Sequence, residues 1–420
     1  MAMSSVIQLS VLTIGLLFSS VFVSGERKLL LANVVYRHGD RSPVGTFPTD
    51  RYQEDFWPQG WGQLTKLGMQ MQYEVGQFLG ERYNGSLFQN STFTREEVYF
   101  RSTDVDRCLM SAASNLAGLF PPSESEKFNP NIAWQPLPIH TEPKEEDYLL
   151  RTSGTKCPYY DELYQKELEG EYANQLNEQN KDFFKFLKNR TGILTDITID
   201  NVFTIEDPLF CEQAHNLILP DWVTDEVMFR LENLTNIGMT MLFAKPELAR
   251  LKGGPLVGKM IKDMETKCEN VTGNPMKFYM YSAHDTTLAA FMSALGVYNK
   301  KQSPYASVVG VELWEDRGNF SVSMWFRNAT DQKKPYALKL ADCGEMCPLP
   351  KFKELLKNVV PLDVKAECGA TFEKNCTIAI VIGTSIIVLT LLLIFLYLIC
   401  RGRHLTQKDG HVRLPQTPDV

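Results

Sequence analysis

Three extended apolar runs in the sequence are each followed by a short polar turn and then by a helical pattern. The runs are Leu29–Tyr36, Val98–Phe100 and Phe278–Tyr281. The helical patterns that follow them are Leu64 to Leu79 at spacings of three and four, Leu109–Phe120 and Leu288–Leu295. This order predicts an α/β fold. Ligands of open parallel sheets lie beyond the carboxyl ends of strands, so we expect the three turns to converge on one crevice.

Between the first two runs and the last lies a long polar segment with helical character. We expect residues 124–270 to form an inserted helical lobe. Further on, two alternating segments flank Asp316-Arg317-Gly318, which predicts a hairpin of Ser307–Trp314 with Asn319–Arg327. The predicted fold class is therefore α/β, with a mixed, mainly parallel sheet flanked by helices and carrying a helical lobe.

The two ends of the chain differ from the middle. Residues 1–25 carry no charge and hold an apolar stretch, which predicts a secretory signal peptide. Residues 378–400 form an uncharged run long enough to span a bilayer once. Because Arg401 and Arg403 follow directly, residues 401–420 are expected in the cytosol and residues 26–375 in the lumen or outside the cell. The sequence thus predicts a type I membrane protein of the lysosome or the plasma membrane.

Composition narrows the classes of function. The 420 residues are 44% hydrophobic and 22% charged, as in a globular protein with a core. A net charge of -7 offers no basic surplus for a phosphate backbone, so nucleic acid is not an expected partner. Six histidines make a multi-metal hydrolase a poor hypothesis, and no metal or cofactor is expected. Glycosylation is expected at the luminal Asn-x-Ser/Thr sites Asn84, Asn90, Asn189, Asn233, Asn270, Asn319 and Asn328.

Eight of the nine cysteines lie on the predicted luminal side, where disulfides are expected. Cys343 and Cys347, four residues apart around Gly344, could close a small loop, with a metal clip as the rival interpretation. Eight cysteines allow 105 pairings, so their number alone fixes no other pair.

The polar turns hold the candidate chemistry. Arg37, His38 and Arg41 stand within five residues, and two guanidiniums beside an imidazole can trap a dianion. Arg101 and His284, at the ends of the other runs, would add donors for the oxygens of a phosphoryl group.

Two of these residues would need opposite protonation states. Asp285 can supply the proton that a leaving alkoxide needs if the bound phosphate raises its pKa. Nearby arginines would lower the pKa of His38 and keep its lone pair free in mild acid. Acidic pH therefore suits both groups.

The motifs RHGDRSP at 37–43 and SAHDTT at 282–287 resemble those of the histidine acid phosphatases, most closely their vertebrate lysosomal and prostatic members. The resemblance covers nearly the whole predicted luminal part. It implies a phosphoglycerate-mutase-like fold and hydrolysis of phosphomonoesters, including phosphorylated peptides or lipids, at acidic pH without metal. It also implies a covalent phosphohistidine intermediate.

The resemblance further implies a role for each residue. His38 would be the nucleophile and Asp285 the proton donor. The phosphate would be bound by Arg37, Arg41, Arg101 and His284. A homodimer with Trp134 and His140 at its interface is also implied.

The resemblance pairs Cys157 with Cys368 and Cys343 with Cys347. The family's partner for Cys211 falls at Val308, which is not cysteine, so Cys268 becomes its candidate partner. Two other functions stay open on the same fold: an inositol-polyphosphate phosphatase and a non-catalytic receptor ectodomain.

Overall fold

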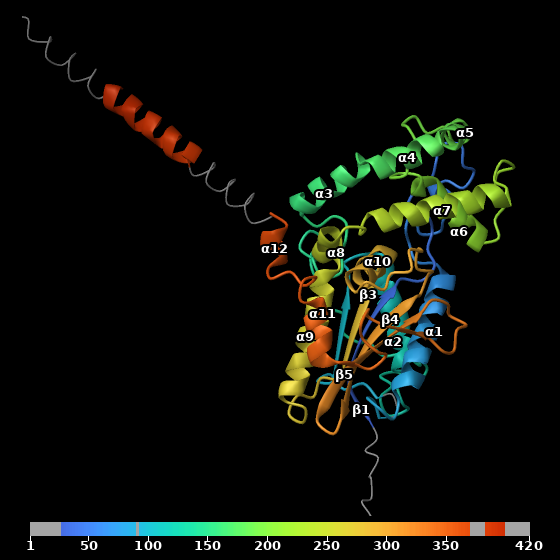
Figure 1. Cartoon of the computed structure of the whole chain (residues 1–420), viewed down its shortest axis with the longest axis vertical. Coiled ribbons are helices and arrows are strands. Elements are labelled where there is room, and N and C mark those ends of the chain that lie inside the picture. Colours follow the sequence, from blue (N-terminus) through green and yellow to red (C-terminus); the bar gives the residue numbers. More distant parts are fainter. Residues whose placement is uncertain (1–26, 90–91, 370–382, 400–420) are drawn as a thin grey trace, which may run out of the picture.

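The computed structural model describes residues 27–89, 92–369 and 383–399, and in these residues a seven-stranded sheet forms the centre of the fold (Figure 1). Its strand order is β2-β3-β1-β4-β5-β6, with β7 paired to β5. The strands are β1 (Lys28–Arg37), β2 (Val98–Ser102), β3 (Phe278–Ala283), β4 (Val308–Asp316), β5 (Asn319–Arg327), β6 (Tyr336–Leu338) and β7 (Cys347–Pro348). The sheet is mixed, as predicted. The parallel pairing that we expected to dominate is confined to β2, β3 and β1.

Both faces of the sheet are covered by helices, which explains why β1 is buried along nearly its whole length. Val34 and Tyr36 pack on one side with α1 (Lys66–Tyr83) and α2 (Asp106–Leu119). Val35, on the other side, packs with α9 (Gly254–Glu269), α10 (Asp285–Ala294) and α11 (Leu349–Leu356). The alternation follows from the two-residue period of a strand.

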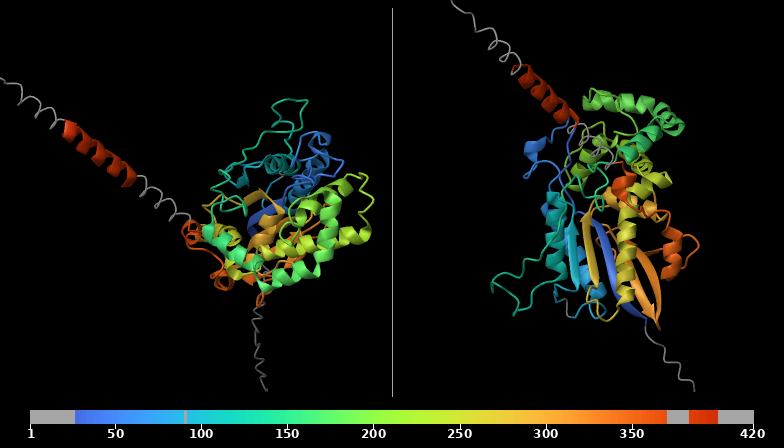
Figure 2. Two further views of the ribbon diagram at one scale, coloured as in Figure 1. Left: turned by 90° about the horizontal axis from the view of Figure 1, so that it is seen from above. Right: turned by 90° about the vertical axis from the view of Figure 1, so that its left-hand side faces the viewer.

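The helical lobe lies beyond the end of the sheet at which β1 finishes (Figures 1 and 2). Its helices are α3 (Pro158–Leu168), α4 (Glu171–Gln179), α5 (Lys181–Thr191), α6 (Phe203–Ala214) and α7 (Asp225–Met241). Most of them share an apolar core of their own. The lobe is shorter than the expected 124–270, because α8 (Pro246–Lys252) and α9 pack in the core against the sheet. Short elements outside these layers are η1 (Glu54–Phe56) and α12 (Val364–Glu367).

The predicted hairpin forms between β4 and β5. Asp316 pairs with Asn319, and the two turn residues Arg317 and Gly318 both have positive φ, at 53° and 80°. Such dihedrals match the twist of the flanking strands, and glycine adopts them without a steric cost.

The described residues contain two disulfides, Cys157–Cys368 and Cys343–Cys347, as the resemblance implied. The expected pair of Cys211 with Cys268 is wrong, because both thiols are free. Cys211 is buried on α6 beside the Tyr305 hydroxyl, whereas Cys268 packs at the edge of the core that covers β1.

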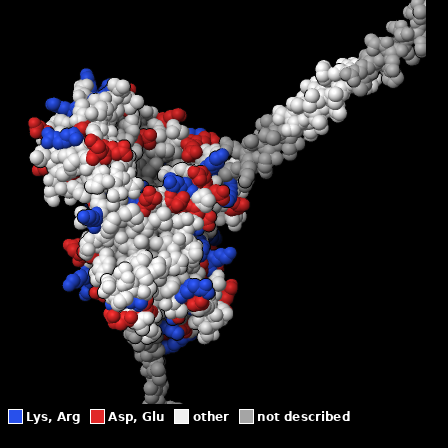
Figure 3. Space-filling view, turned by 180° about the vertical axis from the view of Figure 1, so that it is seen from behind, with Lys and Arg blue, Asp and Glu red and all other residues white. Residues whose placement is uncertain are grey.

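The expectations for the two ends of the chain fall largely outside the described residues. Residues 1–25 and 401–420 are not described, and neither are 378–382 and 400 of the expected span. Residues 383–399 are helical. Within the described residues, no helix has the length and apolar character that crossing a bilayer requires. On the face shown in Figure 3, acidic and basic side chains are interspersed.

We predict that Gly76→Ala destabilises the fold by about 2–3 kcal/mol, because a Cβ there would overlap the neighbouring helix. It would lie 1.9 Å from the Asn115 carbonyl oxygen of α2. Helix propensity alone predicts the opposite sign, since alanine is favoured over glycine. Urea unfolding decides between the packing argument and the propensity argument. The control is Gly45→Ala, because a Cβ at Gly45 meets no atom within 4 Å. Unchanged stability of Gly76→Ala would contradict the packing argument.

Candidate active site

The turn after β1 is held by close backbone packing. A Cβ on Gly39 would lie 2.2 Å from the Gly68 carbonyl oxygen at the start of α1, so only glycine fits this approach. Gln72 of α1 donates to the Arg37 carbonyl oxygen at 2.8 Å. The turn therefore cannot shift without moving α1, and His38 is fixed at the end of β1.

The imidazole of His38 is buried and its orientation is set by one hydrogen bond. Its Nδ1 lies 2.9 Å from the Gly39 carbonyl oxygen, so Nδ1 carries the hydrogen and Nε2 keeps its lone pair. Burial is the largest cause that holds the pKa of His38 well below its usual value, and the charges of Arg107, Arg37 and Arg41 add to it. The ring is therefore a neutral base at acidic pH.

Arg37 joins the first turn to the third. Its guanidinium forms an ion pair with Asp285 at 3.0 Å, donates to the Ser303 carbonyl oxygen at 2.5 Å and lies over the ring of Tyr305. Gln302 also donates to Asp285, at 2.8 Å. Burial would raise the pKa of Asp285, but the Arg37 charge and the Gln302 hydrogen bond bring it well below its usual value.

Arg41 is paired with a carboxylate that the sequence analysis did not identify. Asp207 of α6 accepts from both terminal nitrogens of Arg41, at 2.7 and 3.2 Å. The Asp207 carboxylate also accepts from the Val44 amide at 3.0 Å. This bidentate pair connects the catalytic turn to the helical lobe. No local motif signals it, because the partners are 166 residues apart.

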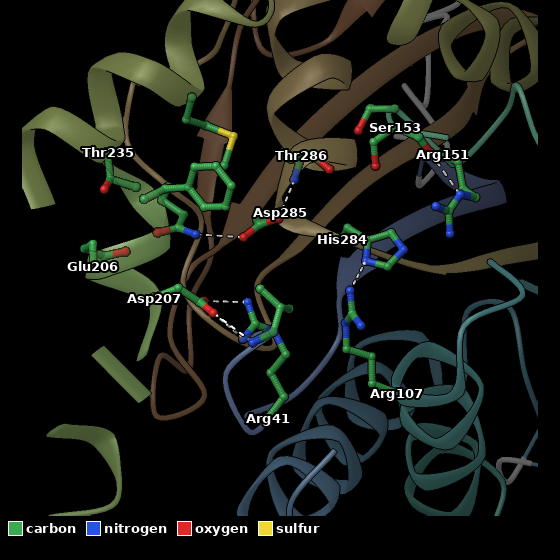
Figure 4. A pocket seen from close by; sticks show the side chains of 15 residues that line it. Arg41, Arg107, Arg151, Ser153, Glu206, Asp207, Thr235, His284, Asp285 and Thr286 are labelled. Carbon is green, nitrogen blue, oxygen red and sulfur yellow. Dashed lines mark hydrogen bonds and ion pairs between the residues drawn. The ribbon is translucent and has the colours of Figure 1, made fainter. Parts of the chain in front are cut away.

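Arg41, Asp207 and Asp285 line a cavity of about 220 Å³ between the sheet and the lobe (Figure 4), and Arg37 is connected to it through its ion pair with Asp285. His38 lies next to it, with its ring centre 5.7 Å from that of His284. The polar and charged lining residues are Arg41, Arg107, Arg151, Thr152, Ser153, Glu206, Asp207, Thr235, His284, Asp285, Thr286 and Gln302. The three turns do converge, as the sequence predicted.

His284 lies at the carboxyl end of β3. Arg107 approaches its Nδ1 at 3.4 Å, and because a guanidinium only donates, Nε2 holds the hydrogen and donates to Thr103 at 3.1 Å. Burial, followed by the Arg107 charge, lowers the pKa of His284 to about 3. It is therefore a neutral donor at acidic pH.

Arg101 does not occupy the place expected of it. It does not line the cavity, and its guanidinium is paired with the buried Asp147 at 2.5 Å. The reason is the length of β2: the sequence pattern ended the strand at Phe100, but it continues to Ser102, so Arg101 lies within the strand. Arg107, at the start of α2, enters the cavity instead, and no carboxylate pairs with it in the described residues.

Glu206 on α6 is a second residue that the sequence analysis missed. It is 4% exposed, lines the cavity and makes no side-chain hydrogen bond within the described chain. Burial, followed by repulsion from Asp207, raises its pKa to about 8. No group of three or more His, Cys, Asp or Glu in the described ranges is arranged to hold a metal ion.

The comparisons with known proteins agree with this geometry. The family model for the histidine phosphatase superfamily (branch 2) matches residues 28–329. Lysosomal acid phosphatase of Xenopus laevis is 44% identical over 97% of this chain and 94% of its own length. The human lysosomal enzyme is 46% identical over 88% of this chain and 87% of its own length. Human prostatic acid phosphatase is 41% identical over 86% of this chain and 94% of its own length.

Solved structures of more distant proteins share the fold. The phytase of Citrobacter braakii aligns with a TM-score of 0.62 and 19% identity over 81% of this chain and 99% of its own. The apo form of the Hafnia alvei phytase aligns with a TM-score of 0.63 and 17% identity over 81% of this chain and 98% of its own. At this identity the likeness concerns the fold alone, so it carries no argument for an inositol-polyphosphate substrate.

The buried Glu206 predicts a pH dependence of stability. Its pKa of about 8 in the folded protein exceeds the ordinary value of 4.5, so the folded state keeps a proton that the unfolded state releases. The stabilisation is complete below about pH 4.5 and is lost as the pH rises toward 8, by on the order of 3 kcal/mol. Chemical unfolding at pH 5, 6.5 and 8 measures it.

In Glu206→Gln the loss of stability between pH 5 and pH 8 should become smaller, because the glutamine cannot ionise. The exposed Glu81→Gln on α1 is the control and should keep the slope of the parent protein, because Glu81 does not contribute to the pKa shift of Glu206. If Glu206→Gln and the parent protein lose equal stability, Glu206 is not the titrating group.

Proposed function

The chain belongs to branch 2 of the histidine phosphatase superfamily, and on that premise we propose which residues carry each step of the reaction. The activity itself is that of an acid phosphatase, which hydrolyses phosphomonoesters through a phosphohistidine. The observation that supports the assignment is a buried, neutral imidazole beside a cavity lined by guanidiniums.

His38 is the nucleophile of the first step. Its free Nε2 attacks phosphorus, the bond from phosphorus to the ester oxygen breaks, and the phosphoryl group becomes bonded to the imidazole. The Nδ1 hydrogen remains on the ring and stays hydrogen-bonded to the Gly39 carbonyl oxygen. This hydrogen bond stabilises the positive charge that the ring gains on attack. The ester oxygen leaves as an alcohol after taking a proton from Asp285.

Arg37, Arg41 and Arg107 bind the phosphoryl oxygens, with Arg107 in the place that we first expected Arg101 to take. His284 joins them by donating its Nε2 hydrogen to a phosphoryl oxygen in place of the Thr103 hydroxyl. Arg107 supplies a charge that forms no ion pair with a carboxylate in the part of the chain that the structure describes. Arg37 and Arg41 instead divide their donors between the phosphate and their carboxylate partners. Preformed charges of this kind stabilise the negative charge of the transition state.

Asp285 acquires its proton when substrate binds. In the free site Arg37 keeps Asp285 ionised, but a phosphate group competes for the same guanidinium. Burial then dominates and raises the pKa of Asp285, so that it can accept the proton that a phosphomonoester carries in mild acid. In the second step the Asp285 carboxylate takes a proton from the water that attacks the phosphohistidine, and phosphate is released.

Location and assembly follow from the relatives and from the ends of the sequence. Relatives named lysosomal and prostatic acid phosphatases support a lysosomal or extracellular enzyme. The uncharged run 378–400 supports a single membrane anchor with the catalytic domain in the lumen or outside the cell. The exposed Trp134, in the loop before His140, is the proposed contact of a homodimer. Five of the six described sequon asparagines are exposed, as glycosylation requires, and Asn328 is partly exposed.

The assignment of His38 predicts that His38→Ala lowers kcat for an aryl phosphate by at least about 10³-fold. Rapid quenching of the parent protein with radiolabelled substrate at pH 5 should trap label that is stable in alkali and labile in acid. Peptide mapping should place this label on His38. Label on another residue, or full turnover by His38→Ala, would refute the assignment.

Replacing Arg107 should harm the reaction far more than replacing Arg101. We expect Arg107→Gln to lower kcat/KM by about 10²-fold, because an unpaired charge on the phosphate is lost. Arg101→Gln leaves Asp147 buried without its partner, so its main cost should appear in thermal stability. Steady-state kinetics and thermal unfolding of both variants separate a role in catalysis from a role in stability. Equal losses of kcat/KM in the two variants would contradict the assignment of Arg107 to the phosphate site.

A further inference from the structure

The guanidiniums around the cavity fall into two classes. Arg41, which lines the cavity, is paired with a carboxylate, and so are Arg37 and Arg101, which do not line it. Arg107 and Arg151 line the cavity and have no carboxylate within ion-pair distance in the described chain. Among the described residues, the cavity therefore presents two positive charges that no carboxylate pairs with.

Only one of these two charges is needed for the group that reacts. Arg107 touches His284 and belongs to the proposed phosphate site. In acid a phosphomonoester carries about one negative charge, because its second pKa is about 6. The charge of Arg151 is therefore not needed to bind the phosphoryl group. The cavity has a volume of about 220 Å³, far more than the ~10–15 Å³ that one water molecule needs by the same measure.

The far side of the cavity does not supply the missing negative charge. In Figure 4, Glu206 and Asp207 lie on one side of Asp285, and Arg107 and Arg151 lie on the other. Asp207 is already neutralised by Arg41 at 2.7 Å. Glu206 holds its proton in acid, because burial raises its pKa to about 8.

The backbone holds Arg151 in place. Its Nε donates to the Ser153 carbonyl oxygen at 3.1 Å, and a Cβ on Gly154 would lie 2.9 Å from an Arg151 terminal nitrogen. Gly154 has a φ of 80°, which also favours glycine. Thr152 and Thr286 line the same cavity and can add hydroxyl donors.

We infer that Arg151 binds an anionic group on the leaving alcohol, so that the preferred substrates are phosphomonoesters with a second negative charge. The inference rests on the proposed function, because it assumes that the phosphoryl group occupies the site beside His38 and Arg107. It names the substrate class of that site and not a different reaction.

The test compares three aryl phosphates that differ only in a para substituent: carboxymethyl, its amide and aminoethyl. Full-length protein is assayed at pH 5 and low salt. We expect kcat/KM for the carboxylate to exceed that for the amide by about five-fold, through KM, and the ammonium compound to be poorest. The preference should shrink at 0.5 M salt, which screens a partly exposed pair.

Arg151→Gln should bring the ratio of carboxylate to amide to about one, whereas Arg151→Lys should keep part of the preference. The matched control is Arg95→Gln, at an exposed arginine that pairs only with its neighbour Glu96. An unchanged ratio in Arg151→Gln, or a preference for the ammonium substrate, overturns the inference. Equal losses on all three substrates would place Arg151 on the phosphoryl group and also overturn it.

Failure of the proposed function gives a different result. If His38→Ala still hydrolyses the amide compound, the nucleophile is wrong, and the inference falls with it. If His38→Ala is inactive but Arg151→Gln keeps the carboxylate preference, only the inference about Arg151 is wrong.

Discussion

The site depends on keeping one imidazole neutral inside the protein. His38 is buried beside three guanidiniums, so protonation of its ring would place like charges together away from water. The same guanidiniums would repel one another were they not offset, and carboxylates do this for Arg37 and Arg41. In the proposed mechanism, the attraction of the site for phosphate and the neutral state of the His38 nucleophile in acid therefore have the same electrostatic origin.

The sheet makes this arrangement possible because its three parallel strands end at one edge. His38 follows β1 and His284 follows β3, and the helices after these strands begin at the same edge. Arg107 enters from the first turn of α2. The helical lobe contributes Asp207, which pairs with Arg41 of the turn after β1. The site is therefore complete only when the lobe packs against the sheet.

Local patterns were sufficient to locate β1 to β5 and the helices that follow the three turns, since alternation and turn chemistry act over a few residues. They failed wherever the answer depended on packing. Whether Arg101 lies in the strand or in the turn depends on the pairing of β2 with β3, which no local pattern reveals. Asp207 and Glu206 carry no signal in their neighbourhood, and Cys211 packs unpaired beside Tyr305 where a disulfide was expected.

In the mechanism that we propose, acid activity follows from competition between the substrate phosphate and Asp285 for the Arg37 guanidinium. In the free enzyme Arg37 holds Asp285 ionised, and a carboxylate in that state cannot protonate a leaving group. Phosphate draws Arg37 away and brings its own proton only in acid, where a monoester keeps it. At higher pH the dianion arrives without a proton, Asp285 stays ionised, and the alkoxide leaves unassisted. The decline of activity toward neutral pH is therefore set by substrate protonation and not by His38, which is neutral throughout this range.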